Sequence, residues 1–355
     1  EPVVGLNLSS GRKHHRRADG LAEALDWLRT AKAAGHQVTY WYFDNETWNR
    51  EANLTLTDED YIEEILYFGR AIKAEFPGAR IIVNPLSSAH IGDWARLERF
   101  LRATGEVVDL VDIHYYWEWG RSSVARWQAQ SPLCSSDQWK PAAQVMPYRD
   151  EIARVRATAA RAGFPQLGVI VLEWNIGPSA ETRRLTEAQL AVMQSEMLLQ
   201  FLEARVEMAC LWPLIWPSNP EVWPQADRFP GIVTYHEPHR RTVSHDLLRL
   251  VSAVAGCARL PLAGDSAETP ALAFASPDGE QVRVLLLNKS DQPRRFSLAV
   301  PTGGPWRWQS AETISMARGR VPSALPAGPE KPGAGVEFAA PAQSFSLLVL
   351  TRSSR

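Results

Sequence analysis

Two glutamates stand at the ends of two apolar segments with the pattern of β-strands. Glu46 closes the segment Tyr40–Glu46 (YWYFDNE), and Glu173 follows the segment Gly168–Leu172 (GVIVL). Two carboxylates that face each other are the minimal equipment for cleaving a glycosidic bond, since one protonates the leaving oxygen while the other attacks or activates water. We therefore take Glu46 and Glu173 as the candidate catalytic pair.

The neighbours of Glu46 fit this chemistry. A general acid must keep its proton near neutral pH, and an aromatic surrounding such as Tyr42, Phe43 and Trp48 raises the pKa of a carboxyl group. The amide of Asn45 can bond a sugar hydroxyl, and such a bond strengthens in the transition state. The alternative interpretation is a solvent-exposed glutamate at a strand end. Asp44 either caps the loop or belongs to the site.

Further polar and aromatic residues stand at other predicted strand ends. His114 and Tyr116 alternate along one strand and so share a face, where an imidazole or hydroxyl can orient a carboxylate and hold it ionised; the alternative is a His–Tyr pair of the core. The chain contains 14 tryptophans, and indole rings stack on the apolar faces of sugars. Of the two in the last strand we favour Trp216 as the platform and assign Trp212 to packing. The predicted substrate contacts are Asn45, Trp48, Asn84, His114, Tyr116, Trp174, Asn175 and Trp216.

Strands that alternate with helices up to about residue 255 must position these side chains. The strands are nearly continuous apolar segments, as expected for a parallel sheet buried on both faces. Polar residues at many strand ends favour an α/β fold of the (β/α)8 TIM-type barrel over an open sheet, whose site lies at one switch point. Only six strand–helix units are visible. The predicted strands are Val3–Leu8, Val38–Phe43, Arg80–Asn84, Leu110–Tyr116, a strand ending at Glu173, and Met208–Ile215.

The pattern changes after residue 255. Helical periodicity gives way to short β segments separated by turn signals such as Ser276-Pro277-Asp278-Gly279, which predicts an antiparallel β-sandwich. We therefore expect a barrel domain at residues 1–255, incomplete at its N-terminal side, and an all-β sandwich domain at residues 256–355.

Composition excludes several classes of partner. A net charge of −2 gives no reason to expect nucleic acid or an anionic membrane surface, and no apolar segment reaches the roughly 18 residues that span a membrane. Cys134, Cys210 and Cys257 lack metal-ligand spacing, and no glycine-rich loop follows a strand, so we expect neither a metal nor a cofactor. The basic segment Arg12–Arg17 is interpreted as a solvated loop, with binding of an anionic substrate as the alternative.

Asn45-Glu46 at one strand end, the His-x-Tyr strand at His114, Glu173 at a later strand end and the trailing sandwich together resemble the retaining glycoside hydrolases of clan A. The nearest groups are the agarase/porphyranase-type and the arabinofuranosidase/xylosidase-type families, both of which join a (β/α)8 barrel to a β-sandwich. The resemblance implies Glu46 as the acid/base on strand four and Glu173 as the nucleophile on strand seven. This sequence differs from the family pattern on both sides of Glu46. Asp44 stands where the family usually has glycine, and Thr47-Trp48 stands where it frequently has Glu-Pro.

Aligned in this way, Val3–Leu8 corresponds to the third strand of the barrel. A barrel without its first two strands exposes two edges, so we expect either a truncation or a homo-oligomer in which a second copy fills the gap. The sequence starts without a signal peptide. Either a leader has been removed, which favours a secreted or periplasmic protein, or residue 1 lies inside a longer protein.

The leading hypothesis is a retaining glycosidase that takes a carbohydrate substrate, with Glu173 attacking and Glu46 serving as acid and then base. Among substrates we favour a β-galactan of the agar or porphyran type, followed by α-L-arabinofuranosides or β-xylosides. The alternative is a carbohydrate-binding or vestigial barrel protein without turnover.

Overall fold

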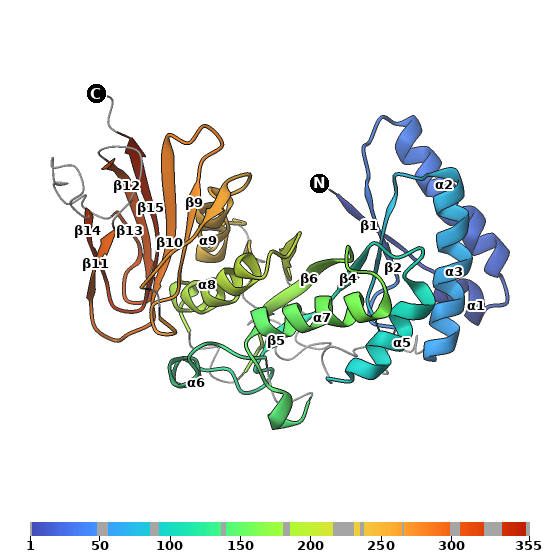
Figure 1. Cartoon of the computed structure of the whole chain (residues 1–355), viewed down its shortest axis with the longest axis horizontal. Helices are drawn as coiled ribbons and strands as arrows, with labels where there is room; N and C mark the ends of the chain where they lie inside the picture. The colour runs from blue at the N-terminus through green and yellow to red at the C-terminus, as the bar shows by residue number, and fades with distance from the viewer. Residues whose placement is uncertain are drawn as a thin grey trace. The chain divides into compact units, whose positions relative to one another are not determined.

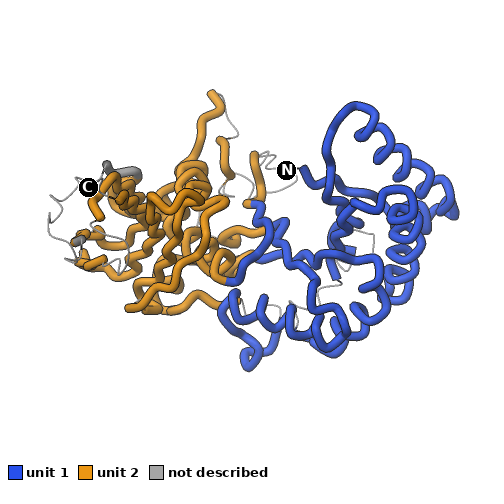
Figure 2. The backbone as a smooth tube through the Cα atoms, turned by 45° about the horizontal axis from the view of Figure 1, so that its top comes forward, with its two compact units in different colours: residues 1–115, 137–173, 204–210 blue, residues 116–136, 174–203, 211–355 orange. Residues whose placement is uncertain are grey.

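The computed structural model describes residues 2–47, 56–85, 92–135, 140–179, 185–215, 231–234, 238–264, 266–298, 306–322 and 336–352. The chain divides into two compact units (Figure 2). Unit 1 comprises residues 1–115, 137–173 and 204–210, and unit 2 comprises residues 116–136, 174–203 and 211–355. Each unit is therefore assembled from segments that are distant in the sequence.

Unit 1 is built on a parallel sheet. Its strands pair in the order β1 to β4 and then β6, each parallel to the next, and β7 also pairs with β6. β5 ends the sheet order beyond β6, and β6 itself continues into unit 2. The strands are β1 (Val3–Leu6), β2 (Tyr40–Phe43), β3 (Arg80–Val83), β4 (Leu110–Asp112), β5 (Tyr115–Trp117), β6 (Gly168–Ile176) and β7 (Ala209–Leu211).

Helices follow the strands of unit 1, as predicted. α3, α5 and α7 pack one against the next, and α2 and α3 lie on one side of strands β1 and β2 (Figure 1). Threonine and aspartate are preferred N-cap residues, and they cap α3 and α5. The Thr57 side chain accepts from Asp60 N, and the Asp93 side chain accepts from Arg96 N. The helices are α1 (Ser9–Lys13), α2 (Arg17–Ala33), α3 (Asp58–Glu75), α5 (Trp94–Thr104) and α7 (Tyr148–Ala162), with a 3₁₀ turn at Ala142–Gln144.

The two faces of the parallel sheet are covered differently. A side chain on Gly69 of α3 would lie 3.5 Å from Ile81, so this helix packs on the face that carries Ile81. Neighbouring residues in a strand point to opposite faces, and Ile82 belongs to a separate apolar cluster on the other face. That cluster consists of Tyr42, Ile82, Leu110 and Ile170, with the partly buried Val3, Tyr40, Leu172 and Met208 packed against it.

The α/β class and the parallel sheet are confirmed, whereas a closed barrel is not found among the described residues. Within the described part of the chain β1 pairs with β2 alone, and six strand–helix units do not supply the eight strands that closure requires. The predicted strand Leu110–Tyr116 is also divided, with β4 ending at Asp112 and β5 starting at Tyr115. His114 lies in the break between them.

The basic segment near the N-terminus takes part in packing. Arg12 bonds both Glu63 and Glu64 of α3 at 2.9 Å, and Arg17 Nε bonds Glu64 at 2.9 Å. The Arg17 guanidinium also lies 4.1 Å from the centre of the Tyr67 ring. These two arginines thus fasten α1 and α2 to α3, which assigns them a structural role.

Unit 2 contains two antiparallel sheets. The larger has the strand order β13-β12-β15-β10-β9-β8, and the smaller pairs β11 with β14. Phe338 of the smaller sheet belongs to the same apolar core as Val284 and Leu348 of the larger, which is the layered arrangement expected of a sandwich. The strands are β8 (Ala258–Leu260), β9 (Ala271–Ala275), β10 (Gln281–Asn288), β11 (Arg294–Leu298), β12 (Trp306–Ser315), β13 (Gly319–Pro322), β14 (Val336–Ala340) and β15 (Ser344–Arg352).

Among the described residues of unit 2 there are also three helices: α6 (Val124–Ala129), α8 (Glu187–Glu203) and α9 (Val243–Ser252). α8 packs against β9, β10, β12, β13 and β15. Helices give way to strands between α9 and β8, where the predicted domain boundary at residues 255 and 256 falls; the division into domains at that point stays a prediction. No helix in the described part of the chain is long and apolar enough to cross a membrane.

Candidate active site

The segment that carries Glu46 is held from two sides where β2 ends. The Tyr61 hydroxyl of α3 donates to Phe43 O at 2.5 Å. The Asp44 carboxylate accepts from the backbone N–H groups of Leu8 and Ser9 at 3.0 and 2.8 Å. Asp44 therefore connects the end of β2 to the segment after β1.

The backbone turns sharply on the way to Glu46. Asp44 has φ 56° and Glu46 has φ 47°, in the left-handed region that residues other than glycine seldom adopt. Such residues cost on the order of 1–3 kcal/mol each and cluster at functional sites. Burial raises the pKa of Asp44 to about 6, although its N–H partners act in the opposite direction.

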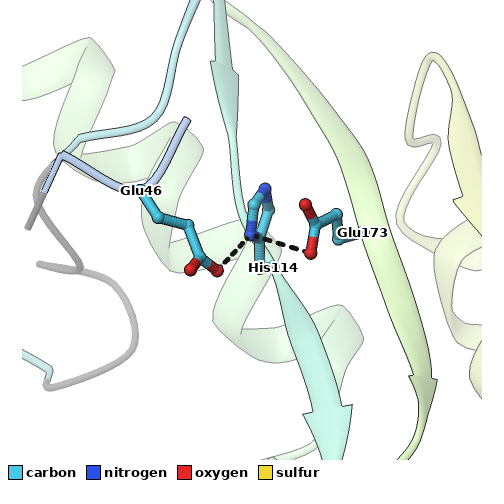
Figure 3. Close-up of side chains that lie close together, drawn as sticks. All are labelled: Glu46, His114 and Glu173. Carbon is cyan, nitrogen blue, oxygen red and sulfur yellow. Dashed lines mark hydrogen bonds and ion pairs between the residues drawn. The ribbon is translucent and has the colours of Figure 1, made fainter. Parts of the chain in front are cut away.

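His114 lies between the two predicted catalytic glutamates (Figure 3). Its Nδ1 is 2.7 Å from Glu46 Oε1 and 3.6 Å from Glu173 Oε2. The imidazole is 2% exposed, whereas the side chains of Glu46 and Glu173 are 19% and 20% exposed. The fold thus brings together three residues that the sequence placed on three separate strand ends, and leaves both carboxylates accessible to a ligand.

The spacing of the two carboxylates indicates a reaction type. One oxygen of Glu46 and one of Glu173 lie within 4.8 Å of each other. The two carboxyl groups are about 5–5.5 Å apart in retaining glycosidases and about 6.5–9.5 Å apart in inverting ones, which need room for a water molecule. The separation found here is on the retaining side.

A third carboxylate, that of Asp112, contacts the other nitrogen of the His114 ring and contributes to its charge. Asp112 Oδ2 is 2.9 Å from His114 Nε2. Burial lowers the pKa of His114, but Asp112, Glu46 and Glu173 together raise it to about 10. The imidazole is therefore protonated at neutral pH, and both ring nitrogens donate hydrogen bonds.

The protonated imidazole also bears on metal binding. Within the described part of the chain, Glu46, His114 and Glu173 offer ligand atoms close enough to share an ion. Metal ligation needs a neutral imidazole with a free lone pair, and both nitrogens of His114 are already engaged with carboxylates. We therefore assign no metal to Glu46, His114 and Glu173. That the protein works without a metal stays a prediction.

Two further polar residues of unit 1 surround the imidazole. The buried Tyr42 hydroxyl donates to Asn45 Oδ1 at 3.0 Å and lies 3.4 Å from His114 Nε2. Burial, and secondly Asp112, raise the pKa of Tyr42 well above its usual value. Asn84 is also buried, and its Nδ2 donates to the backbone oxygen of Asp112 at 3.2 Å. Asn84 thus helps to hold Asp112, the carboxylate that contacts His114, in place.

Two predicted sugar contacts that follow Glu173 are buried in unit 2. Trp174 is fully buried and meets Phe201 edge-on at 5.6 Å between ring centres. Asn175 Nδ2 donates to Trp212 O at 2.7 Å, and its Oδ1 accepts from Gln194 Nε2 at 2.9 Å. Both side chains contribute to the packing of unit 2.

The remaining predicted contacts are aromatic. Tyr116 is partly exposed and meets Trp119 edge-on at 5.2 Å and Trp212 at 6.0 Å between ring centres. Trp48 and Trp216 lie outside the described residues. Their roles and that of Tyr116 as sugar contacts stay predictions.

Asp112 is the site residue that the sequence analysis missed. It stands in an apolar strand, where a single aspartate has no pattern to identify it. Its position two residues before His114 is the available signal, because alternate residues of a strand point to the same face.

No protein-family model matches the chain, and no curated protein matches it in sequence. Solved structures share its fold. An α-L-arabinofuranosidase from Thermotoga maritima, in complex with arabinose, has a TM-score of 0.67 at 15% identity, over 99% of this chain and 76% of that chain. A thermostable GH51 α-L-arabinofuranosidase from Thermotoga petrophila RKU-1 has a TM-score of 0.68 at 15% identity, over 98% of this chain and 75% of that chain.

A GH39 enzyme from Xanthomonas axonopodis pv. citri also matches, with a TM-score of 0.63 at 16% identity, over 95% of this chain and 74% of that chain. At such identities the likeness concerns the fold. Two of these three structures are arabinofuranosidases, which belong to one of the two groups that the sequence resembles.

Proposed function

We propose that the protein is a retaining glycoside hydrolase acting on an oligosaccharide or polysaccharide. The observation that carries this proposal is the pair Glu46 and Glu173, whose oxygens lie within 4.8 Å of each other. The fold shared with two arabinofuranosidases and a GH39 enzyme supports it.

The proposed mechanism is double displacement. The Glu173 carboxylate attacks the anomeric carbon while Glu46 protonates the leaving oxygen, which gives a glycosyl ester of Glu173 and a free alcohol. Glu46, now ionised, takes a proton from water, whose oxygen attacks the same carbon and releases Glu173. His114 stays protonated throughout, donates from Nδ1 to Glu46 at 2.7 Å and forms an ion pair with Glu173 at 3.6 Å.

We further propose that the parallel sheet is part of a (β/α)8 barrel. Helix α3 packs on one face of the sheet, as the outer ring of helices does in such a barrel. The apolar cluster around Ile82 lies on the other face, as the side chains that fill a barrel interior do. Glu46 and His114 follow the carboxyl ends of their strands, where barrel enzymes keep their active sites.

For the substrate we propose two classes. The α-L-arabinofuranosides are supported by the arabinofuranosidase folds, and the β-xylosides rest on the sequence resemblance. The agar- or porphyran-type β-galactans rest on the sequence resemblance and the aromatic neighbours of Glu46.

A glycoside panel tests the proposal. The panel contains aryl α-L-arabinofuranosides, β-xylosides and β-galactosides together with agar and porphyran oligosaccharides. We expect wild type to hydrolyse one class, and both Glu46→Ala and Glu173→Ala to lose that activity while keeping a cooperative unfolding transition in urea. The matched control is Glu106→Ala, an exposed glutamate of unit 1 paired with Arg70.

Added azide separates the two roles. We expect Glu46→Ala with azide to yield a glycosyl azide of retained configuration, and Glu173→Ala with azide to yield the inverted one. Full activity of Glu173→Ala overturns the proposal. Binding of a glycan by wild type without any cleavage supports the non-catalytic alternative instead.

A further inference from the structure

We propose that Asp112 is a positioning residue of the catalytic site, which acts through His114 to keep one N–H group directed at both catalytic glutamates. This inference rests on the proposed function of Glu46 and Glu173.

Asp112 is fixed on every side. Its side chain is fully buried. Its Oδ1 accepts from the backbone N–H of Leu172 at 2.8 Å, and its Oδ2 accepts from His114 Nε2 at 2.9 Å and lies 3.4 Å from Asn84 Nδ2. Leu172 directly precedes Glu173 on β6, so a single carboxylate ties the imidazole to the strand that carries the predicted nucleophile.

The groups that face His114 determine its charge. They are Asp112 at the end of β4, Glu46 after β2, Glu173 on β6, and the Tyr42 hydroxyl on β2. A buried carboxylate without a cationic partner is strongly destabilising, so Asp112 favours the imidazolium form. The pKa of His114, raised to about 10, agrees with that expectation.

This arrangement suits a reaction in which the negative charge alternates between two carboxylates. Glu173 is ionised before attack, when Glu46 carries the proton. Glu46 is ionised in the glycosyl-enzyme, when Glu173 is an ester. The His114 Nδ1–H group, 2.7 Å from one and 3.6 Å from the other, stabilises whichever carboxylate bears the charge, and no proton needs to leave the ring.

The test replaces Asp112 with an isosteric neutral residue. In Asp112→Asn the amide oxygen can still accept from Leu172, whereas the amide nitrogen faces His114 Nε2 and favours a neutral ring. We expect kcat on the responsive glycoside to fall about 10- to 100-fold, by analogy with the loss of a carboxylate that orients a metal-ligating histidine, with KM unchanged. The control is Asp93→Asn, since asparagine also caps a helix; it should retain wild-type kcat.

Histidine NMR gives a second readout that needs no substrate. With ¹³C-labelled histidine and His114→Gln to assign the signal, His114 of wild type should keep the chemical shift of an imidazolium up to at least about pH 8, above the ordinary histidine pKa of about 6.5. In Asp112→Asn the same signal should titrate at a lower pH.

Two results overturn the inference. One is a wild-type His114 that titrates near its ordinary pKa, which requires only wild type and the assignment variant even if Asp112→Asn fails to fold. The other is an Asp112→Asn protein with wild-type kcat and pH profile. A protein that cleaves no glycoside but keeps His114 charged contradicts the proposed function alone.

Discussion

Replacing His114 with glutamine should make the free energy of unfolding less dependent on pH. The folded-state pKa of His114 is about 10, against an ordinary value of 6.5. Because the folded value is the higher one, the stabilisation is fully present below pH 6.5 and is lost as the pH rises through about 10. The difference between the two pKa values corresponds to roughly 5 kcal/mol of stability.

Urea denaturation at several pH values between 6 and 10 measures this effect. The quantity to compare is the free energy of unfolding of wild type minus that of His114→Gln, which cancels groups whose pKa values are the same in both proteins. We expect this difference to be several kcal/mol larger at pH 6 than at pH 10. The control His36→Gln removes an exposed histidine and should follow wild type. A difference that stays constant from pH 6 to pH 10 would refute the charged cluster around His114.

Three further predictions concern other parts of the chain. Lys289→Met leaves the buried Glu196, now 2.8 Å from the lysine, without its cation and should lower the free energy of unfolding by about 3–5 kcal/mol; equal stability of variant and wild type in urea contradicts this. Gly177→Ala places a Cβ 2.6 Å from the Trp119 backbone and should cost about 1–3 kcal/mol, whereas an unchanged thermal midpoint speaks against that contact. Dialysis against EDTA should leave glycosidase activity unchanged, and loss of activity that a divalent cation restores would assign a metal to the site.

The elements of unit 1 could be predicted from the sequence because each carries its own local signal. Apolar segments such as Arg80–Val83 identify the strands, and Thr57 and Asp93 cap the helices that follow. Barrel closure has no such local signal, since it depends on how many strands are present to pair. The contact of His114 with the carboxylates was predicted, but the part of Asp112 in this network was not, because burial of Asp112 is a property of the packed sheet.

Strand length explains the placement of the residues after Glu173. The apolar pattern predicts a strand that ends at Glu173, which would place the next residues in the mouth of the site. β6 continues to Ile176, and Trp174 and Asn175 are therefore still strand residues with buried side chains. Glu46 and Glu173 could be paired from sequence because parallel strands end at the same side of a sheet.

The configuration of the first product tests the central proposal most directly. Proton NMR of the anomeric signal, recorded on a cleaved glycoside before the free sugar mutarotates, distinguishes retention from inversion. Because the oxygens of Glu46 and Glu173 lie within 4.8 Å of each other, we predict a first product with the anomeric configuration of the substrate. A first product of inverted configuration would contradict the double-displacement mechanism.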